Sequence, residues 1–287
     1  MDVAVDADII QYEVAFAAEA YWKHKHKEMG VEVDGPPPFD VVETMLLGRL
    51  EQICEDAGGG NPLLFFTGKN NYRNHLAKTN EYKNRETSRP FHYKNVKAYL
   101  QSRYDWEQED WFEADDLIKL IMIKNPGKYI CASRDKDLHQ IPGRHYGWEL
   151  GKQPAFGPID IDELGFLKLI RKPKGTKLLG GGEKYFYAQM LMGDRTDSIE
   201  GIEGMGNVTA FSLLSPLETV EELQSTVFGV YVKAFDNKAT DRFLETGNLL
   251  RMAEDVDDDF TQVKLWNPLS TKAQWMDVKT GEIIEKG

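Results

Sequence analysis

The stretch Val3-Ala-Val-Asp-Ala-Asp-Ile-Ile10 places a carboxylate directly after a short apolar run and before a segment of helical length. Residues 63–67 and 129–133 are further short runs rich in apolar β-branched or aromatic side chains, which is typical of buried parallel strands. Helix-length segments lie at residues 9–27, 41–57 and 113–124. This alternation predicts an α/β fold with an open, mostly parallel sheet and helices on both faces, which binds ligands beyond the carboxyl ends of its strands.

Acidic residues gather in four clusters, each of which follows an apolar run. The clusters are Asp6, then Glu113 with Asp115 and Asp116, then Asp135 with Asp137, and finally Asp194 with Asp197. Any one cluster alone is more simply explained by helix capping or by a turn. At one edge of a sheet, however, these carboxylates would repel one another unless divalent cations neutralised them. The four clusters together therefore predict a magnesium site.

The charge of the chain is unevenly distributed. The 287 residues carry a net charge of −12, yet residues 67–103 contain nine Lys and Arg against two acids, a balance of +7. A basic arm beside an acidic site would attract a polyanion to the metal. The chain has no apolar run long enough to cross a bilayer and no export signal, and its two cysteines support neither a disulfide framework nor a zinc site. We expect a cytoplasmic protein without a membrane partner.

The second half of the sequence predicts a helical module. Residues 175–182 are expected to form a flexible basic loop before an apolar helix at 183–192, and the glycine turn at 201–210 would open a helix with backbone amides free for a phosphate. We expect an α/β core at 1–170 that includes a basic arch at about 67–103, a helical DNA-binding module at 171–235, and a C-terminal extension at 236–287 with an acidic segment and a short docked strand.

The order and spacing of these motifs resemble the 5′-nuclease family, which comprises flap endonucleases, the 5′ to 3′ exonuclease domain of bacterial DNA polymerase I, and bacteriophage 5′ to 3′ exonucleases. The resemblance runs from Asp6 to about Leu214 and includes Phe66-Thr-Gly-Lys-Asn-Asn-Tyr-Arg73, Glu113-Ala-Asp-Asp116 and Gly193-Asp-Arg-Thr-Asp197. The length of the chain makes it most similar to the free-standing bacteriophage enzymes. The resemblance implies a PIN-like core, a helical arch and a helix-hairpin module that grips duplex DNA.

The resemblance also implies roles for individual residues. A first metal ion would be held by Asp6, Glu113, Asp115 and Asp135, and a second by Asp137, Asp194 and Asp197, with Asp116 in support. The catalytic cations in the arch would be Lys83, Arg73 and Arg85, and Tyr82 beside them offers a face on which an unpaired base could stack. The other expected DNA-binding residues are Lys69, Lys78, Arg89, Lys172, Lys174, Lys177, Gly204, Gly206 and Thr209. Two Mg²⁺ ions, with Mn²⁺ as a substitute, would be the cofactors, and a K⁺ ion could bind at the hairpin.

Two positions depart from the family pattern. Gly68 stands where the family usually has Asp after the second strand, so one contact to the first metal would be missing or come from water, Asn70 or Asn71. Val208 stands where the family often has Lys before Thr209-Ala210, so the duplex grip would depend more on backbone amides and nearby lysines. We expect weaker binding of the metal and of the duplex.

The function that these observations predict is a magnesium-dependent 5′ to 3′ exonuclease or 5′ flap endonuclease. Its substrate would be double-stranded DNA with a free 5′ end or flap, or the RNA of an RNA·DNA hybrid, and its products would carry a 5′ phosphate. One alternative is a haloacid-dehalogenase-type phosphatase with Asp6 as nucleophile, because Asp6-Ala-Asp8 follows a strand. The other alternative is a non-catalytic reader of branched DNA. If the chain is encoded by a phage, the cytoplasm is that of the host cell.

Overall fold

A six-stranded sheet forms the centre of the computed structural model, which describes residues 1–32, 35–83, 88–173 and 175–286. Its strand order is β3-β2-β1-β4-β5-β6, with β1 Asp2–Asp6, β2 Pro62–Phe66, β3 Asp105–Gln108, β4 Tyr129–Ala132, β5 Gly143–Gly147 and β6 Phe156–Ile161. All pairs are parallel except β5 with β6. The predicted fold class is confirmed, and β1, β2 and β4 are the three strands that the apolar runs indicated.

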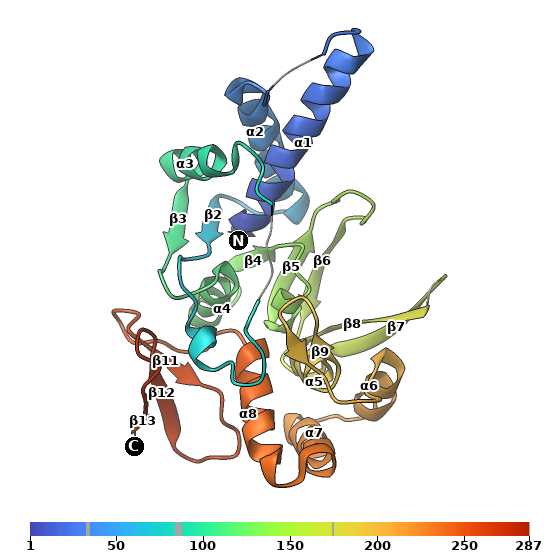
Figure 1. Cartoon of the computed structure of the whole chain (residues 1–287), viewed down its shortest axis with the longest axis vertical. Helices are drawn as coiled ribbons and strands as arrows, with labels where there is room; N and C mark the ends of the chain where they lie inside the picture. Colours follow the sequence, from blue (N-terminus) through green and yellow to red (C-terminus); the bar gives the residue numbers. More distant parts are fainter. Residues whose placement is uncertain (33–34, 84–87, 174, 287) are drawn as a thin grey trace.

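Helices cover both faces of this sheet (Figure 1). Val3 and Val5 of β1 pack in one apolar cluster with α1 Ala7–Glu28, α2 Phe39–Ala57 and α3 Tyr93–Arg103. Ala4, between them, faces the other cluster, where α4 Ala114–Lys124 lies. Successive side chains of a strand point to opposite faces, which is why one short apolar run contributes to two cores.

Four helices form in the second half of the chain, where the sequence predicted a helical module, but one segment of that module differs from the prediction. The helices are α5 Gly182–Met192, α6 Asn207–Leu214, α7 Val220–Phe235 and α8 Ala239–Leu250. The prediction of a flexible loop at 175–182 was wrong, because β8 Gly175–Gly181 pairs in register with β7 Phe166–Lys172 to form an antiparallel hairpin. Glycine favours turns, but Gly180 and Gly181 lie so close to neighbouring atoms that a side chain would not fit, and this close packing explains them here.

The C-terminal residues add a small antiparallel sheet of β11 Gln262–Leu265, β12 Ala273–Asp277 and β13 Ile283–Lys286, where one short strand was expected. Val263 and Met276 of this sheet are buried in the same cluster as α4, α5, α7 and α8. The predicted division into core, module and extension therefore crosses one continuous apolar core. Short elements complete the chain: η1 Tyr72–His75, η2 Asp137–Gln140, η3 Asp236–Lys238, β9 Gly193–Asp194 and β10 Ile199–Glu200.

The predicted basic arch is described only in part. Residues 67–103 include η1 and α3, and α3 packs against α1. Residues 84–87, among them Arg85, lie outside the described residues, as does Lys174. Among the helices of the described ranges, no helix has both the length and the apolar character that crossing a bilayer requires.

Candidate active site

Three carboxylates meet where β1, β4 and α4 come together. Asp6 is the last residue of β1, Asp135 follows β4 by three residues, and Asp115 is the second residue of α4. The Ser133 hydroxyl donates to Asp6 Oδ2 at 2.9 Å and accepts from the Asp135 backbone N–H at 2.9 Å, which ties the ends of the two strands together. Parallel strands end at one edge of the sheet, so strand order alone brings these acids to one place.

These three acids, which we call the open group, all have raised pKa values. Burial, with Asp8 and Asp135 nearby, raises the pKa of Asp6 to about 7. Burial, with Asp135 and Asp6 nearby, raises the pKa of Asp115 well above its ordinary value, and burial also raises that of Asp135. No Lys or Arg in the described ranges forms an ion pair with any of the three. The open group is thus a concentration of buried and half-buried negative charge without an ion-pair partner, which Lys83 and Lys136 offset only in part.

Glu113 differs from the open group because protein cations neutralise it. Lys83 Nζ donates to Glu113 Oε1, Arg73 Nη1 lies 3.3 Å from Oε2, and the Tyr82 hydroxyl donates to Oε2 at 3.0 Å. Burial opposes the charge, but Lys83 and Arg73 lower the pKa of Glu113 to about 2. Lys83 also lies 3.7 Å from Asp197 Oδ2, so this lysine joins the start of α4 to the turn after β9.

Asp116 is held by protein donors on both of its oxygens. Arg73 donates to Oδ1 at 2.7 Å and to Oδ2 at 2.8 Å, and the backbone N–H groups of Ala253 and Glu113 donate to Oδ1 and Oδ2 at 2.8 and 3.1 Å. Asp116 is 0% exposed and Arg73 is 2% exposed. We call this pair, with the Tyr72 hydroxyl that also faces Asp116, the anchor group.

A second lysine bridges the remaining acids. Lys136 Nζ donates to Asp137 Oδ1 at 2.9 Å and to Asp194 Oδ2 at 2.6 Å. Burial acts against ionisation of Asp194, but Lys136 lowers its pKa, whereas burial and Asp135 raise the pKa of Asp137 to about 6. Lys136 was not among the predicted site residues, although its position between Asp135 and Asp137 was a signal for it.

The structure thus brings all eight predicted metal-binding acids to one edge of the sheet, but it places two other predicted residues differently. Tyr82 is 7% exposed and belongs to the apolar core, so its ring is not free to stack on a base. Arg73 lies beneath the carboxylates with its guanidinium paired, and contact with a substrate phosphate would require that pairing to break. Both positions result from contacts with Glu113 and Asp116 at the start of α4, which lie 31 to 43 residues away in the sequence and which local patterns do not reveal.

The predicted DNA-binding residues lie on the surface but not in one place. Lys69, Lys78 and Arg89 are exposed on either side of η1 and before α3, whereas Lys172 and Lys177 are exposed on the β7–β8 hairpin. In the glycine turn, Gly204 has a φ of +80° and its carbonyl accepts a hydrogen bond from the Thr209 hydroxyl at 3.2 Å. Gly206 precedes α6 as its N-cap, as the glycine pattern predicted.

Gly68 has no room for the carboxylate that the family pattern places there. A Cβ atom on Gly68 would lie 2.1 Å from the carbonyl oxygen of Glu109 and 2.5 Å from that of Asp110. Asp8 occupies the neighbouring space, because its Oδ2 accepts the Thr67 backbone N–H at 3.0 Å at the end of β2. Asp8 also raises the pKa of Asp6, and its own pKa is raised by burial and, to a lesser degree, by Glu113. It is a site residue that sequence reasoning missed, although Asp6-Ala7-Asp8 was visible.

The donor set suits a hard divalent cation, although the acids do not converge on one point. Carboxylate oxygens are the ligands that Mg²⁺ and Mn²⁺ prefer, and Mg²⁺ usually keeps several waters between itself and the protein. Within the described ranges, no three His, Cys, Asp or Glu side chains are close enough to hold one ion directly. The negative charge of the open group, which has no ion-pair partner among the described residues, is the feature that fits a bound cation.

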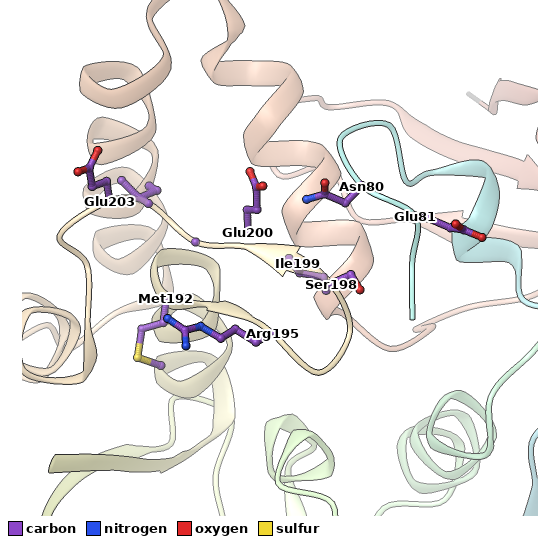
Figure 2. Close-up of a pocket in the computed structure, with 10 residues that line it drawn as sticks. Asn80, Glu81, Met192, Arg195, Ser198, Ile199, Glu200 and Glu203 are labelled. Carbon is purple, nitrogen blue, oxygen red and sulfur yellow. The ribbon is translucent and has the colours of Figure 1, made fainter. Parts of the chain in front are cut away.

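Among the described residues, the lining of a large open cavity includes none of the eight acids, and Figure 2 shows the residues that form this lining. Its volume is about 670 Å³, and it separates Asn80 and Glu81 from the turn that carries Arg195, Ser198 and Glu200. In the part of the chain that the structure describes, its lining includes three glutamates, Glu81, Glu200 and Glu203, and one cation, Arg195. Such a lining repels a phosphate backbone, so we do not assign the substrate to this cavity.

Sequence comparison relates the chain to DNA polymerase I and to a 5′-3′ exonuclease. No protein-family model matches it. It is 25% identical over 236 residues to the DNA polymerase I of Bacillus caldotenax and 27% identical over 250 residues to that of Bacillus subtilis (strain 168). These matches cover 78% and 82% of the chain but 24% and 26% of the relatives, so the chain spans about a quarter of their length. A 5′-3′ exonuclease of Mycobacterium tuberculosis is 28% identical over 123 residues, which are 40% of this chain and 36% of that protein.

Two solved structures from bacteriophage T5 also align with this structure. One is a flap endonuclease in a pseudo-enzyme–product complex with DNA and metal ions, with a TM-score of 0.49, 14% identity, and coverage of 86% of this chain and 94% of that one. The other is a 5′-exonuclease with bound zinc ions, with a TM-score of 0.49, 15% identity, and coverage of 87% and 95%. At these TM-scores the likeness carries no argument about the function of this chain.

Proposed function

We propose that this chain, which belongs to the 5′-nuclease family, is a divalent-metal-dependent nuclease that hydrolyses phosphodiester bonds near the 5′ ends of DNA. The proposed substrate is double-stranded DNA with a free 5′ end or a 5′ flap, and the products carry a 5′ phosphate. The names of the relatives support this interpretation. The chain covers only about a quarter of the length of the polymerases, so we do not infer the other activities of those proteins for it.

The observation that carries the proposal is the open group. Asp6, Asp115 and Asp135 are brought together from two strands and a helix, and ionisation of all three is costly without a cation. A fold that required only stability would pair these acids, as it pairs Asp116 with Arg73. We therefore assign Asp6, Asp115 and Asp135, together with Asp8, to the first metal ion.

The remaining residues have distinct proposed roles. Mg²⁺ bound at such a site supplies an activated water and stabilises charge on the attacking and leaving oxygens. Lys83 has a partly exposed side chain, so its ammonium can turn from Glu113 toward the charge that develops on the phosphate. Asp137, Asp194 and Asp197 would hold a second ion once their ion pairs with Lys136 and Lys83 are broken. Arg73 and Asp116 position Glu113 and do not contact the substrate.

Three finer parts of the proposal concern the ions, the substrate and the duplex. Mg²⁺ is the proposed ion, with Mn²⁺ as a substitute, because all the ligands are carboxylates. A K⁺ ion at the glycine turn and hydrolysis of RNA in RNA·DNA hybrids are extensions of the family resemblance. The hairpin with Lys172 and Lys177 and the turn at Gly204 are the proposed contacts to the duplex.

The experiment that tests the proposal is cleavage of a duplex with a 5′ flap, labelled at either end in separate reactions, with magnesium and with chelator. The proposal predicts products only with magnesium, and their lengths distinguish stepwise release of mononucleotides from one cut at the junction. Intact DNA that still shifts on a gel would mean a binding protein without catalysis. Hydrolysis of a small phosphomonoester but not of DNA would favour the phosphatase alternative.

A further inference from the structure

Aromatic side chains line a path that leads away from the carboxylates along α1. Asp8, Tyr12 and Phe16 are spaced four residues apart, so they lie on one face of the helix at intervals of about 6 Å. The rings of Tyr12 and Phe16 are stacked, with centroids 6.3 Å apart. The path therefore begins at Asp8, beside the end of β2, and leads outward to Phe16.

The segment before α3 widens this path. The ring of Tyr93, the first residue of α3, lies 4.7 Å from that of Tyr12. The backbone N–H of Phe91 donates to Glu19 Oε1 at 2.7 Å, which places Phe91 one helical turn beyond Phe16. Figure 1 shows the start of α3 beside α1, in agreement with their packing. We call Tyr12, Phe16, Phe91 and Tyr93 the aromatic ladder.

The two phenylalanines of the ladder are exposed, its two tyrosines are half-buried, and cations lie beside it. Phe91 is 66% exposed and Phe16 is 42% exposed, both unusual values for phenylalanine. The Arg89 guanidinium lies 5.1 Å from the centroid of the Tyr93 ring, and the next residue after Tyr93, Lys94, is exposed. Residues 88–103 contain four basic residues and no acid, in a chain whose net charge is −12. Exposed rings interleaved with cations are the surface on which unpaired nucleotides stack.

We propose that the aromatic ladder binds the unpaired 5′ strand of the substrate, with bases stacked on Phe16 and Phe91 and with phosphates near Arg89 and Lys94. The position of the ladder one turn from Asp8 would hold that strand next to the acids, an assignment that rests on the proposed nuclease function. A protein partner fits less well, because the exposed side chains of Arg89 and Lys94 beside the rings favour a polyanionic strand, while the Glu19 carboxylate is held by the Phe91 backbone N–H.

The test compares two labelled DNA duplexes by fluorescence anisotropy, in chelator so that no cleavage occurs. One duplex carries a short 5′ arm of unpaired thymidines and the other is blunt. Phe16→Ala and Phe91→Ala should each weaken binding of the armed duplex roughly tenfold and leave binding of the blunt duplex unchanged. Phe16→Tyr and Phe91→Tyr keep a stacking surface and should bind the armed duplex as the unaltered protein does.

Tyr21→Ala is the matched control. Tyr21 is also on α1 and is 49% exposed, but it lies nine residues from Tyr12 and therefore on the opposite face of the helix. The proposal is overturned if Tyr21→Ala weakens binding of the armed duplex as much as Phe91→Ala does. It is also overturned if Phe16→Ala and Phe91→Ala weaken binding of both duplexes to the same extent, or if they leave the affinity for the armed duplex unchanged. Because binding is measured without metal, a protein that binds the arm through the ladder but never cuts would contradict the nuclease function and leave the ladder supported.

Discussion

Asp115 and Asp116 are neighbours in the first turn of α4, yet they lie in opposite environments. Asp116 points into the anchor group, where Arg73 and two backbone N–H groups occupy both of its oxygens. Asp115 points toward Asp6 and Asp135 and accepts no hydrogen bond from the described residues. Successive helical residues diverge by about 100°, so one Asp-Asp pair can serve two regions. The anchor group stabilises the fold, and the open group is left charged for a ligand.

The largest expected effect comes from neutralising the open group. Asp115→Asn should lower the rate of magnesium-dependent cleavage on the order of 10³-fold, because a charge that holds the metal is lost. In chelator the same variant should unfold at a higher denaturant concentration than the unaltered protein, because repulsion from Asp6 and Asp135 is relieved. Chemical denaturation and flap cleavage measured on one preparation check both. A variant that is less stable in chelator would show that Asp115 belongs to the anchor.

Breaking the anchor group should lower the stability of the fold, whereas neutralising the open group should raise it in chelator. Asp116→Ala leaves the Arg73 guanidinium buried without its main partner, so the free energy of unfolding should fall by about 3–5 kcal/mol. Urea denaturation measures the loss. The double variant with Arg73→Met and Asp116→Leu should recover part of that stability, because it removes both charges together. If the single variant were as stable as the unaltered protein, the proposed division between the two groups would fail.

Asp8→Asn tests whether the open group extends to the end of β2. We expect metal affinity to fall roughly tenfold to a hundredfold while cleavage at saturating metal changes little, because Asp8 is one of several carboxylates at the edge. Calorimetric titration with Mn²⁺ gives the affinity, and Asp2→Asn, at the half-buried start of β1 and the opposite end of that strand from Asp6, is a matched control. Equal affinities for the Asp8 variant and the control would exclude Asp8 from the metal site.

The smallest effect concerns pH and the metal-free protein. The folded-state pKa of Asp6 is about 7 against an ordinary value of 3.8, so the folded state binds more protons than the unfolded state between these values. The contribution of Asp6 to stability is therefore fully present below about pH 4 and is lost as the pH rises through 7, by on the order of 1–3 kcal/mol. Glu113, with its pKa lowered to about 2, contributes in the opposite sense only below its ordinary value of 4.5. Denaturation in chelator between pH 5 and 8 should show stability falling with pH, and saturating magnesium should remove that slope.

The sequence predicted the central fold and the acidic edge because both depend on local patterns. Apolar runs marked β1, β2 and β4, and helical periodicity marked α1, α2 and α4. It did not predict β3, β5 or β6, and it took β8 for a loop because glycine is common in both turns and close-packed strands. The burial of Tyr82 and the pairing of Arg73 with Asp116 depend on contacts between distant segments, which composition and spacing do not encode.

The site also shows where a substitution can only be understood in three dimensions. Gly68 suggested a missing metal contact, and the sequence offered water, Asn70 or Asn71 in its place. The structure instead brings Asp8 to the same strand end, while the carbonyls of Glu109 and Asp110 leave no space for a side chain on Gly68. Asp8 lies sixty residues before Gly68 in the sequence. Only the pairing of β1 with β2 brings the Asp8 carboxylate to the strand end where the family pattern has an Asp in place of Gly68.

The most direct test of the central claim is to measure DNA cleavage and DNA binding side by side for Asp135→Ala. Asp135 belongs to the open group and forms no ion pair with a described Lys or Arg, so its loss should remove the metal site without disturbing the DNA-binding surface. We predict that cleavage of a 5′-flapped duplex in magnesium is abolished while the dissociation constant for the same duplex in chelator is essentially unchanged. Cleavage retained at the rate of the unaltered protein would contradict the claim that these acids carry the chemistry.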